Sequence, residues 1–453
     1  MTIRAFLERT DAVSRSTARE IQPQLAARVG AGALVWTLLA FAGAPHWALV
    51  PTAAALAGAA LLAPPRALAM PALDAPLIAA LGVVLLQLLP LPLALHQAVA
   101  PHAGTINRLL RFDADHAYAR PLSIDPGATR EALLIATLAL ATFWIVREAG
   151  AHGRLRPMLR AVAWGGLAVS VAAIVGKSVG PSLIFGVWDP GVLATPYGPF
   201  VNRNHMGTWL VLALPLIVGY IAARFDGGRG ARAIDGTMVW LLAAAIVMLA
   251  ALVISLSRSA AVGLVVAAAF AAPVALRTRA RAKWGVLAGL VLAIGIVILV
   301  PRTVDLTLRF ENSGTTETWA RPQIWRETIP IVRDFPWTGS GAGSFATAML
   351  AYQQSDRRFL FNQAHNQYLQ LAAEGGLLLL LPLAWAAVGF ARRAAASLAS
   401  DRSPMLWIRL GALAGVVGVA VQSIWETGLR LPANAVLFAA VCAIAVHRRS
   451  PRA

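Results

Sequence analysis

The feature that most constrains this 453-residue chain is a series of long runs without a single Asp, Glu, Lys or Arg. Most of them leave room for about 17–25 apolar residues, the length at which an α-helix crosses a bilayer. In lipid every backbone polar group must pair within its own structure, and no run shows the alternating pattern of a membrane β-barrel. The runs therefore predict membrane-spanning helices.

We expect an all-α polytopic membrane protein with about twelve transmembrane helices and one large, helical external loop. The composition agrees, because 58% of the residues are hydrophobic, 13% are charged and the mean hydropathy is +0.66. Such values exclude an ordinary cytosolic enzyme, a disordered regulator and a secreted disulfide scaffold. The predicted spans are 29–44, 47–64, 75–94, 128–146, 158–176, 204–223, 237–256, 259–276, 284–300, 368–391, 406–423 and 431–447.

The distribution of Lys and Arg predicts the orientation. If the N-terminus lies in the cytoplasm, most of the 39 basic residues fall on the inner side, including the clusters at 277–283 and 447–453. The predicted organisation is a cytoplasmic segment 1–28, nine spans within 29–300, an external loop 301–367, three spans within 368–447, and a cytoplasmic tail 448–453. The net charge of +18 then arises from the Lys and Arg residues that orient the chain in the membrane. We therefore expect no nucleic-acid partner.

Two arginines lie at predicted outer helix ends, where the positive-inside rule disfavours them. Arg203 follows Asn202 and precedes His205 where an outside-to-inside helix begins, and Arg258 lies in a short turn between two spans. A helix N-terminus with an arginine is suited to bind a phosphate. The alternative is that both residues anchor the chain at the interface, with Asn202 as a helix cap.

A third polar segment, AHNQYLQLAAEGG at 364–376, opens another predicted outside-to-inside helix. Its His365 is a candidate general base near neutral pH, with Asn366 beside it. The alternatives are a capping histidine and, for Glu374, a polar residue at the membrane boundary. GSGAGSF at 339–345 lacks the ending of a phosphate-binding loop and is better read as a turn.

The external loop contains a candidate interfacial amphipathic helix within 315–337, with Trp319, Ile324, Trp325 and Ile329 on one face. Arg321 and Arg326 lie on other faces and are candidates for phosphate or sugar contacts. The scattered carboxylates and the single cysteine, Cys442, give little support to a metal site, so we expect none.

NRNHMGTWL at 202–210, SLSRSA at 255–260, the segment 322–345 and AHNQYLQLAAEGG, in this order, resemble the bacterial O-antigen ligase and polymerase family. The resemblance covers about 190–380, with Met206 and Gly207 in place of a more usual Phe-Ala pair. It implies a multi-pass inner-membrane glycosyltransferase with its active site facing the periplasm. The essential arginines and histidine of that family match Arg203, Arg258 and His365.

The resemblance further implies the reaction. A glycan moves from undecaprenyl diphosphate to a sugar hydroxyl, either on lipid A–core or on another lipid-linked chain, without nucleotide, metal or other cofactor. The arginines would stabilise the departing diphosphate and His365 would take the hydroxyl proton. Asn202, His205, Arg321, Arg326 and Asn366 are predicted substrate contacts.

Other functions stay open at this stage. A lipid-linked glycan flippase or a non-catalytic export component would share the hydropathy, although spans with little but Gln87 and Gln422 argue against proton coupling. Within the family, ligase, polymerase and protein glycosyltransferase are alternatives. PLSIDPGATREALL at 121–134 is more similar to capsule and exopolysaccharide polymerases.

Overall fold

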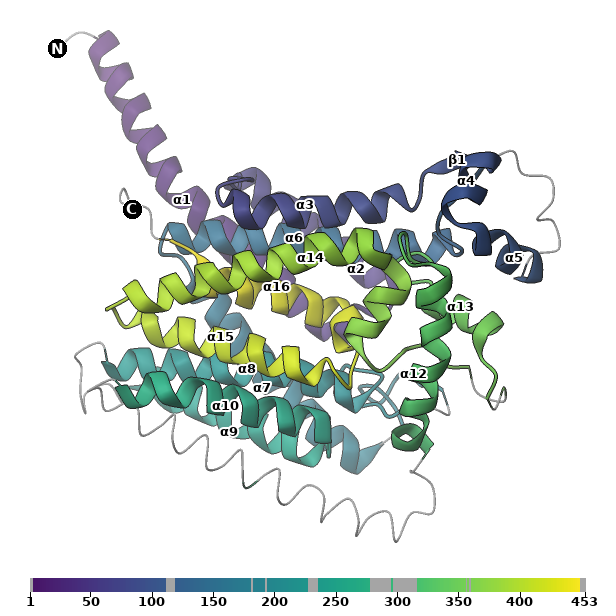
Figure 1. Cartoon of the computed structure of the whole chain (residues 1–453). Coiled ribbons are helices and arrows are strands. Elements are labelled where there is room, and N and C mark those ends of the chain that lie inside the picture. Colours follow the sequence, from purple (N-terminus) through teal and green to yellow (C-terminus); the bar gives the residue numbers. More distant parts are fainter. Residues whose placement is uncertain are drawn as a thin grey trace.

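The computed structural model describes residues 3–110, 119–180, 182–191, 194–226, 235–277, 295, 316–355, 357 and 360–448. Figure 1 shows a bundle of long helices with a smaller layer of helices across one end. The bundle consists of α1 (Ile3–Leu39), α2 (His46–Leu62), α3 (Pro71–Leu86), α6 (Pro126–Ala151), α7 (Arg156–Val179), α8 (Arg203–Arg224), α9 (Gly236–Ile254), α10 (Arg258–Arg277), α14 (Gln367–Ser400), α15 (Met405–Gln422) and α16 (Pro432–Val446).

The predicted all-α polytopic class is confirmed. Among the described helices, seven are long and apolar enough to cross a membrane, and three more are apolar but shorter. Helices lie at each predicted span except 284–300, which falls outside the described residues apart from position 295. The first part of the predicted external loop, 301–315, also lies outside them. The orientation stays a prediction.

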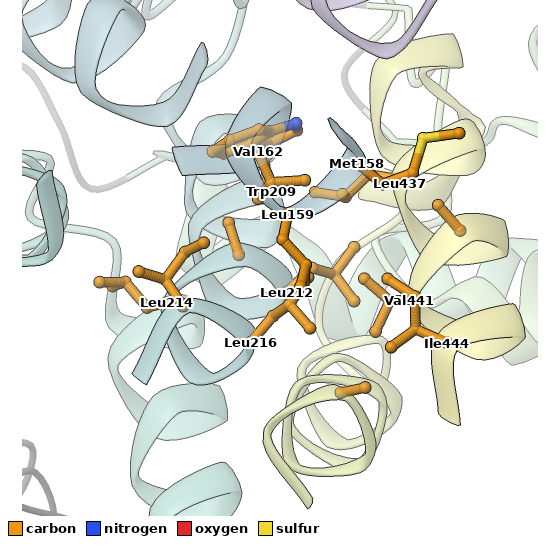
Figure 2. Close-up of a cluster of buried hydrophobic side chains, with 14 of the residues drawn as sticks. Met158, Leu159, Val162, Trp209, Leu212, Leu214, Leu216, Leu437, Val441 and Ile444 are labelled. Atoms are coloured by element: carbon orange, nitrogen blue, oxygen red, sulfur yellow. The ribbon is translucent and has the colours of Figure 1, made fainter. Parts of the chain in front are cut away.

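The core of the bundle surrounds α8, which is the most buried of the seven spanning helices. Figure 2 shows side chains of α7, α8 and α16 meeting there, among them Met158, Trp209 and Val441. Glycines permit close helix contacts: a Cβ on Gly219 of α8 would lie 2.3 Å from the Trp407 carbonyl oxygen of α15. Packing through small residues is the usual way in which membrane helices associate.

The layer across the end of the bundle is a cap with its own apolar core. It contains α4 (Leu93–Val99), α5 (Pro101–Leu110), α12 (Thr316–Asp334) and α13 (Phe345–Tyr352), and a short antiparallel pair of strands, β1 (Pro90–Pro92) and β2 (Ala119–Pro121). Ile106, Ile324, Ile331, Phe335 and Phe345 form part of its core. Helices α12 and α13 of this cap pack against α14.

One predicted span requires correction. The span 75–94 is shorter, because α3 ends at Leu86 and the prolines at 90 and 92 belong to strand β1. The first span is continuous with the polar segment before it, since α1 runs without a break from Ile3 to Leu39.

One polar residue and one apolar pair also lie elsewhere than predicted. Gln87 is not at a span centre but at the end of α3, where its amide donates to the carbonyl oxygens of Thr338 and Glu374 at 2.7 and 2.9 Å. Ile324 and Ile329 do not share a face of α12, because Ile324 is buried at 3% exposure while Ile329 is 41% exposed.

Candidate functional site

The first part of the site is the start of α8. Asn202 caps this helix, its side-chain oxygen accepting from Asn204 N at 2.7 Å, as predicted for a cap. Arg203 is the first helical residue, and its backbone N–H donates to Thr195 O at 2.8 Å. The Arg203 guanidinium is half-buried and forms no hydrogen bond or ion pair with any described residue. It is therefore available to an anion.

The second part is the turn before α10. Leu256 adopts a left-handed conformation with φ 54°, and Ser255 Oγ accepts from Ser257 N at 3.2 Å, which together redirect the chain into the new helix. Ser257 Oγ donates to Asn204 Oδ1 at 2.8 Å, so this turn is bonded to the start of α8. Arg258, the first residue of α10, is exposed beside it.

The two helices approach closely because position 207 is a glycine. A Cβ there would lie 2.6 Å from Ala260 Cβ, which is tighter than side chains tolerate. Gly207 thus serves packing between α8 and α10.

The third part is the start of α14. His365 has φ 48°, a conformation that residues with a Cβ rarely adopt and that is typical of functional or strained positions. Asn366 caps α14 by accepting from Leu369 N at 3.0 Å. Trp325 Nε1 of α12 donates to Ala364 O at 2.9 Å, and Gln367 N donates to Ser423 O at 2.8 Å. The histidine is therefore held between the cap and the end of α15.

These three helix starts meet around the segment that follows α15. Gln422 Nε2, at the end of α15, approaches Ser259 Oγ of α10 at 3.5 Å, and Ser423 binds the start of α14 as described above. Asn434 Nδ2 donates to His205 O of α8 at 3.0 Å. Arg203, Arg258 and His365, far apart in sequence, thus lie at neighbouring helix ends around one short loop.

Glu426, in this loop, is the site residue that the sequence analysis missed. It is 1% exposed, and its Oε1 accepts from Arg321 Nη2 at 2.7 Å. Its Oε2 lies 3.9 Å from His365 Nδ1. Burial alone would raise the pKa of Glu426, but the neighbouring His365 and Arg321 more than offset this and hold it below its ordinary value. Glu426 is therefore an ionised carboxylate buried next to the candidate base.

The other predicted contacts divide into two groups. Arg321 reaches the centre of the site through Glu426, and His205 lies there as well, 5% exposed with neither ring nitrogen bonded to a described residue. Arg326 is exposed on α12 and bonds to no described residue, so no contact in the described part of the chain connects it to Glu426 or His365. Arg430, which was not predicted, lies 3.8 Å from Glu374 Oε1.

The GSGAGSF loop is explained by packing. Glu374 accepts from the backbone N–H groups of Gly343 and Phe345 at 2.9 and 3.2 Å, and Gln87 Oε1 accepts from Ala342 N at 2.9 Å. These N–H groups are already bonded and hold no phosphate. Gly376, with φ 56° and ψ −166°, breaks α14 beside this loop.

The site contains more positively charged than negatively charged side chains. Arg203, Arg258, Arg321 and Arg430 lie at or beside it, against the buried carboxylates of Glu426 and Glu374. Three helix N-termini add partial positive charge at the same place. The arrangement therefore suits an anionic ligand with a reacting group close to His365.

The comparison with protein families gives one match. Residues 243–384 match the family model Wzy_C, described as O-antigen ligase. The matched part includes Arg258, Arg321 and His365, whereas Arg203 and Glu426 lie on either side of it. The comparison with curated proteins gives no match.

Proposed function

We propose that this chain, whose residues 243–384 match the O-antigen ligase family model, transfers a glycan from a polyprenyl-diphosphate donor to a sugar hydroxyl on the periplasmic face of the inner membrane. The observation that carries the proposal is the buried chain of contacts from Arg321 through Glu426 to His365, placed among three helix N-termini. It brings a candidate base and a cationic environment to one place.

The diphosphate is the leaving group in this reaction. When the bond between the anomeric carbon and the phosphate oxygen breaks, the electron pair stays on that oxygen and negative charge increases there. Arg203 and Arg258, with the N-termini of α8 and α10, supply fixed positive charge where it develops. Arg203 has a guanidinium that is available to hold two phosphate oxygens.

The acceptor hydroxyl forms the new glycosidic bond. Its oxygen attacks the anomeric carbon from the side opposite the diphosphate, which inverts that centre, and its proton passes to His365. Because Nδ1 of His365 faces Glu426, Nε2 is the nitrogen that remains for the acceptor. The buried negative charge, 3.9 Å from Nδ1, would stabilise the imidazolium that forms, as a carboxylate does beside other catalytic histidines.

The test is transfer by the purified full-length protein, reconstituted with an undecaprenyl-diphosphate-linked glycan and no nucleotide. Two acceptors are offered separately: lipid A–core, and a second lipid-linked glycan. Product on lipid A–core indicates a ligase, and product on the lipid-linked glycan indicates a polymerase. Donor that crosses the bilayer without any new glycosidic bond would identify a flippase and overturn the proposal.

A further inference from the structure

A cavity with a partly charged lining lies at the end of the bundle opposite the candidate site. It has a volume of about 590 Å³, within the range of small-ligand sites, and is bounded by the ends of α6, α7, α8, α15 and α16. In Figure 1 this is the end toward which the C-terminus points. No residue of the proposed transferase site contributes to it.

Arginines from three helices line this cavity: Arg156 of α7, Arg224 of α8 and Arg409 of α15. Two carboxylates also line it, and both are already bound. Asp235 accepts from Arg224 Nη2 at 2.9 and 2.7 Å, and Asp401 accepts from Arg409 Nε at 2.9 Å. Three cations against two paired carboxylates leave one positive charge in excess.

That excess belongs to Arg156, which is exposed and forms no hydrogen bond or ion pair with a described residue. A second unmet donor is Arg224 Nε, which is buried without a partner in the described part of the chain. These two donors come from different helices and border the same cavity. A buried donor without a partner is costly, and an anion in the cavity would satisfy it.

The start of α7 adds to the positive potential. Arg156 is its first residue, and the preceding Leu155 provides no side-chain cap. The N–H groups of this first turn therefore have no side-chain acceptor, and the dipole of a 24-residue helix ends beside the arginine. An anion in the cavity would supply the missing acceptor.

The rest of the lining is apolar and belongs to helices that cross the membrane. It is contributed by Leu155 just before α7, Leu159 of α7, Tyr220 of α8, and Met405 and Ile408 of α15. A ligand that combines a charged phosphate with an apolar body fits both halves of this lining. Soluble anions fit only the charged half.

We propose that this cavity is a lipid-binding site, in which Arg156 and the start of α7 hold the phosphate of an anionic phospholipid. The apolar wall contacts its glycerol and acyl portion. The site is separate from the transferase site, so the inference stands whether or not the proposed transfer reaction is correct.

The test compares the full-length protein in lipid nanodiscs made of phosphatidylcholine alone and of phosphatidylcholine with phosphatidylglycerol. Arg156→Gln removes the free guanidinium, and Arg154→Gln is a matched control, because Arg154 is exposed two residues away and does not line the cavity. Thermal midpoint and retention of phosphatidylglycerol by native mass spectrometry are measured for each. A ligand that binds only the folded state raises the midpoint.

We expect phosphatidylglycerol to stabilise the wild type and Arg154→Gln, and to bind Arg156→Gln at least about tenfold more weakly, the loss typical of one charge-assisted hydrogen bond. Equal binding by the two variants would overturn the inference, as would an absence of stabilisation in the wild type. Inorganic phosphate is titrated into the phosphatidylcholine discs. If it stabilises the protein as much as the lipid does, a soluble anion is the occupant and the lipid assignment is wrong.

Discussion

Replacing Glu426 by Gln tests the proposed mechanism most directly. The substitution keeps the shape of the side chain and removes its charge from a position that is 1% exposed. His365 Nδ1 then loses a carboxylate 3.9 Å away, and Arg321 loses its partner at 2.7 Å. If His365 becomes protonated as the hydroxyl attacks, the variant stabilises that charge less.

The size of the effect follows from the distance. Opposite unit charges about 4 Å apart attract by roughly 4 kcal/mol at an effective dielectric constant near 20. Arg321 neutralises part of the carboxylate, so we take about 3 kcal/mol, which corresponds to about a 10²-fold fall in kcat. KM for the lipid-linked donor should change little, because the arginines assigned to the diphosphate remain. Glu426→Asp keeps the charge and should retain more activity than the amide.

The assay measures kcat and KM for transfer, together with the thermal midpoint of the same preparations. Glu327→Gln is the matched control, since Glu327 is also a buried carboxylate, 5% exposed, but binds Gln323 and Ser355 in the cap. If Glu426→Gln folds and turns over like Glu327→Gln, Glu426 does not orient the base. The assignment of His365 would then lose its support in the structure.

Four other outcomes are expected. Arg203→Lys and Arg258→Lys keep the charge but lose the planar fork, so transfer in the reconstituted assay should be severely impaired in folded protein, whereas Arg333→Lys in the cap should not affect it. His365→Ala should lose about 10²–10⁴-fold in turnover while still binding the donor in a pull-down with lipid-linked glycan. Gly339→Ala should lower the thermal midpoint clearly, since its Cβ would lie 2.2 Å from a backbone carbon of α14, whereas Gly186→Ala, with open space, should lower it less. The pKa of Glu426 in the folded protein lies below its unfolded value of 4.5, so the ionised carboxylate contributes to stability above pH 4.5. This contribution is lost as the pH falls further. The difference in thermal midpoint between wild type and Glu426→Gln should therefore shrink below pH 4.5.

The helices were predictable because the sequence encodes them locally. A run without charges predicts a segment that can cross lipid, and the charges on either side predict where the span ends. The end of α3 was misjudged for a local reason too: 75–94 stays apolar through the prolines that turn it into strand β1. Hydropathy indicates whether a segment can lie in lipid. It does not show that prolines prevent the helix from continuing.

The candidate site was partly predictable, because each of its helix starts carries its own polar motif. Asn202 was expected as a cap or a substrate contact and Asn366 as a substrate contact, and in the structure they cap α8 and α14. Glu426 was not expected, since in the sequence it only ends a charge-free run. Its importance comes from Arg321, 105 residues away in the chain, and from His365. No local sequence pattern reveals these contacts, because they join the cap to the loop after α15.

The break in α14 links the cap to the chemistry. Gly376 divides the helix, and Leu377 N and Leu378 N donate to Pro336 O and Trp337 O at 2.9 and 3.0 Å instead of continuing the helical pattern. The first turns of α14 are thus bonded to the cap through this break and through Glu374. His365 at their start takes its position from the cap and from the end of α15, while Arg203 and Arg258 take theirs from the membrane bundle. If the proposed roles hold, His365 and the two arginines reach working geometry only when cap and bundle are docked, so Gly339→Ala, made far from any reacting atom, should impair transfer as well as stability.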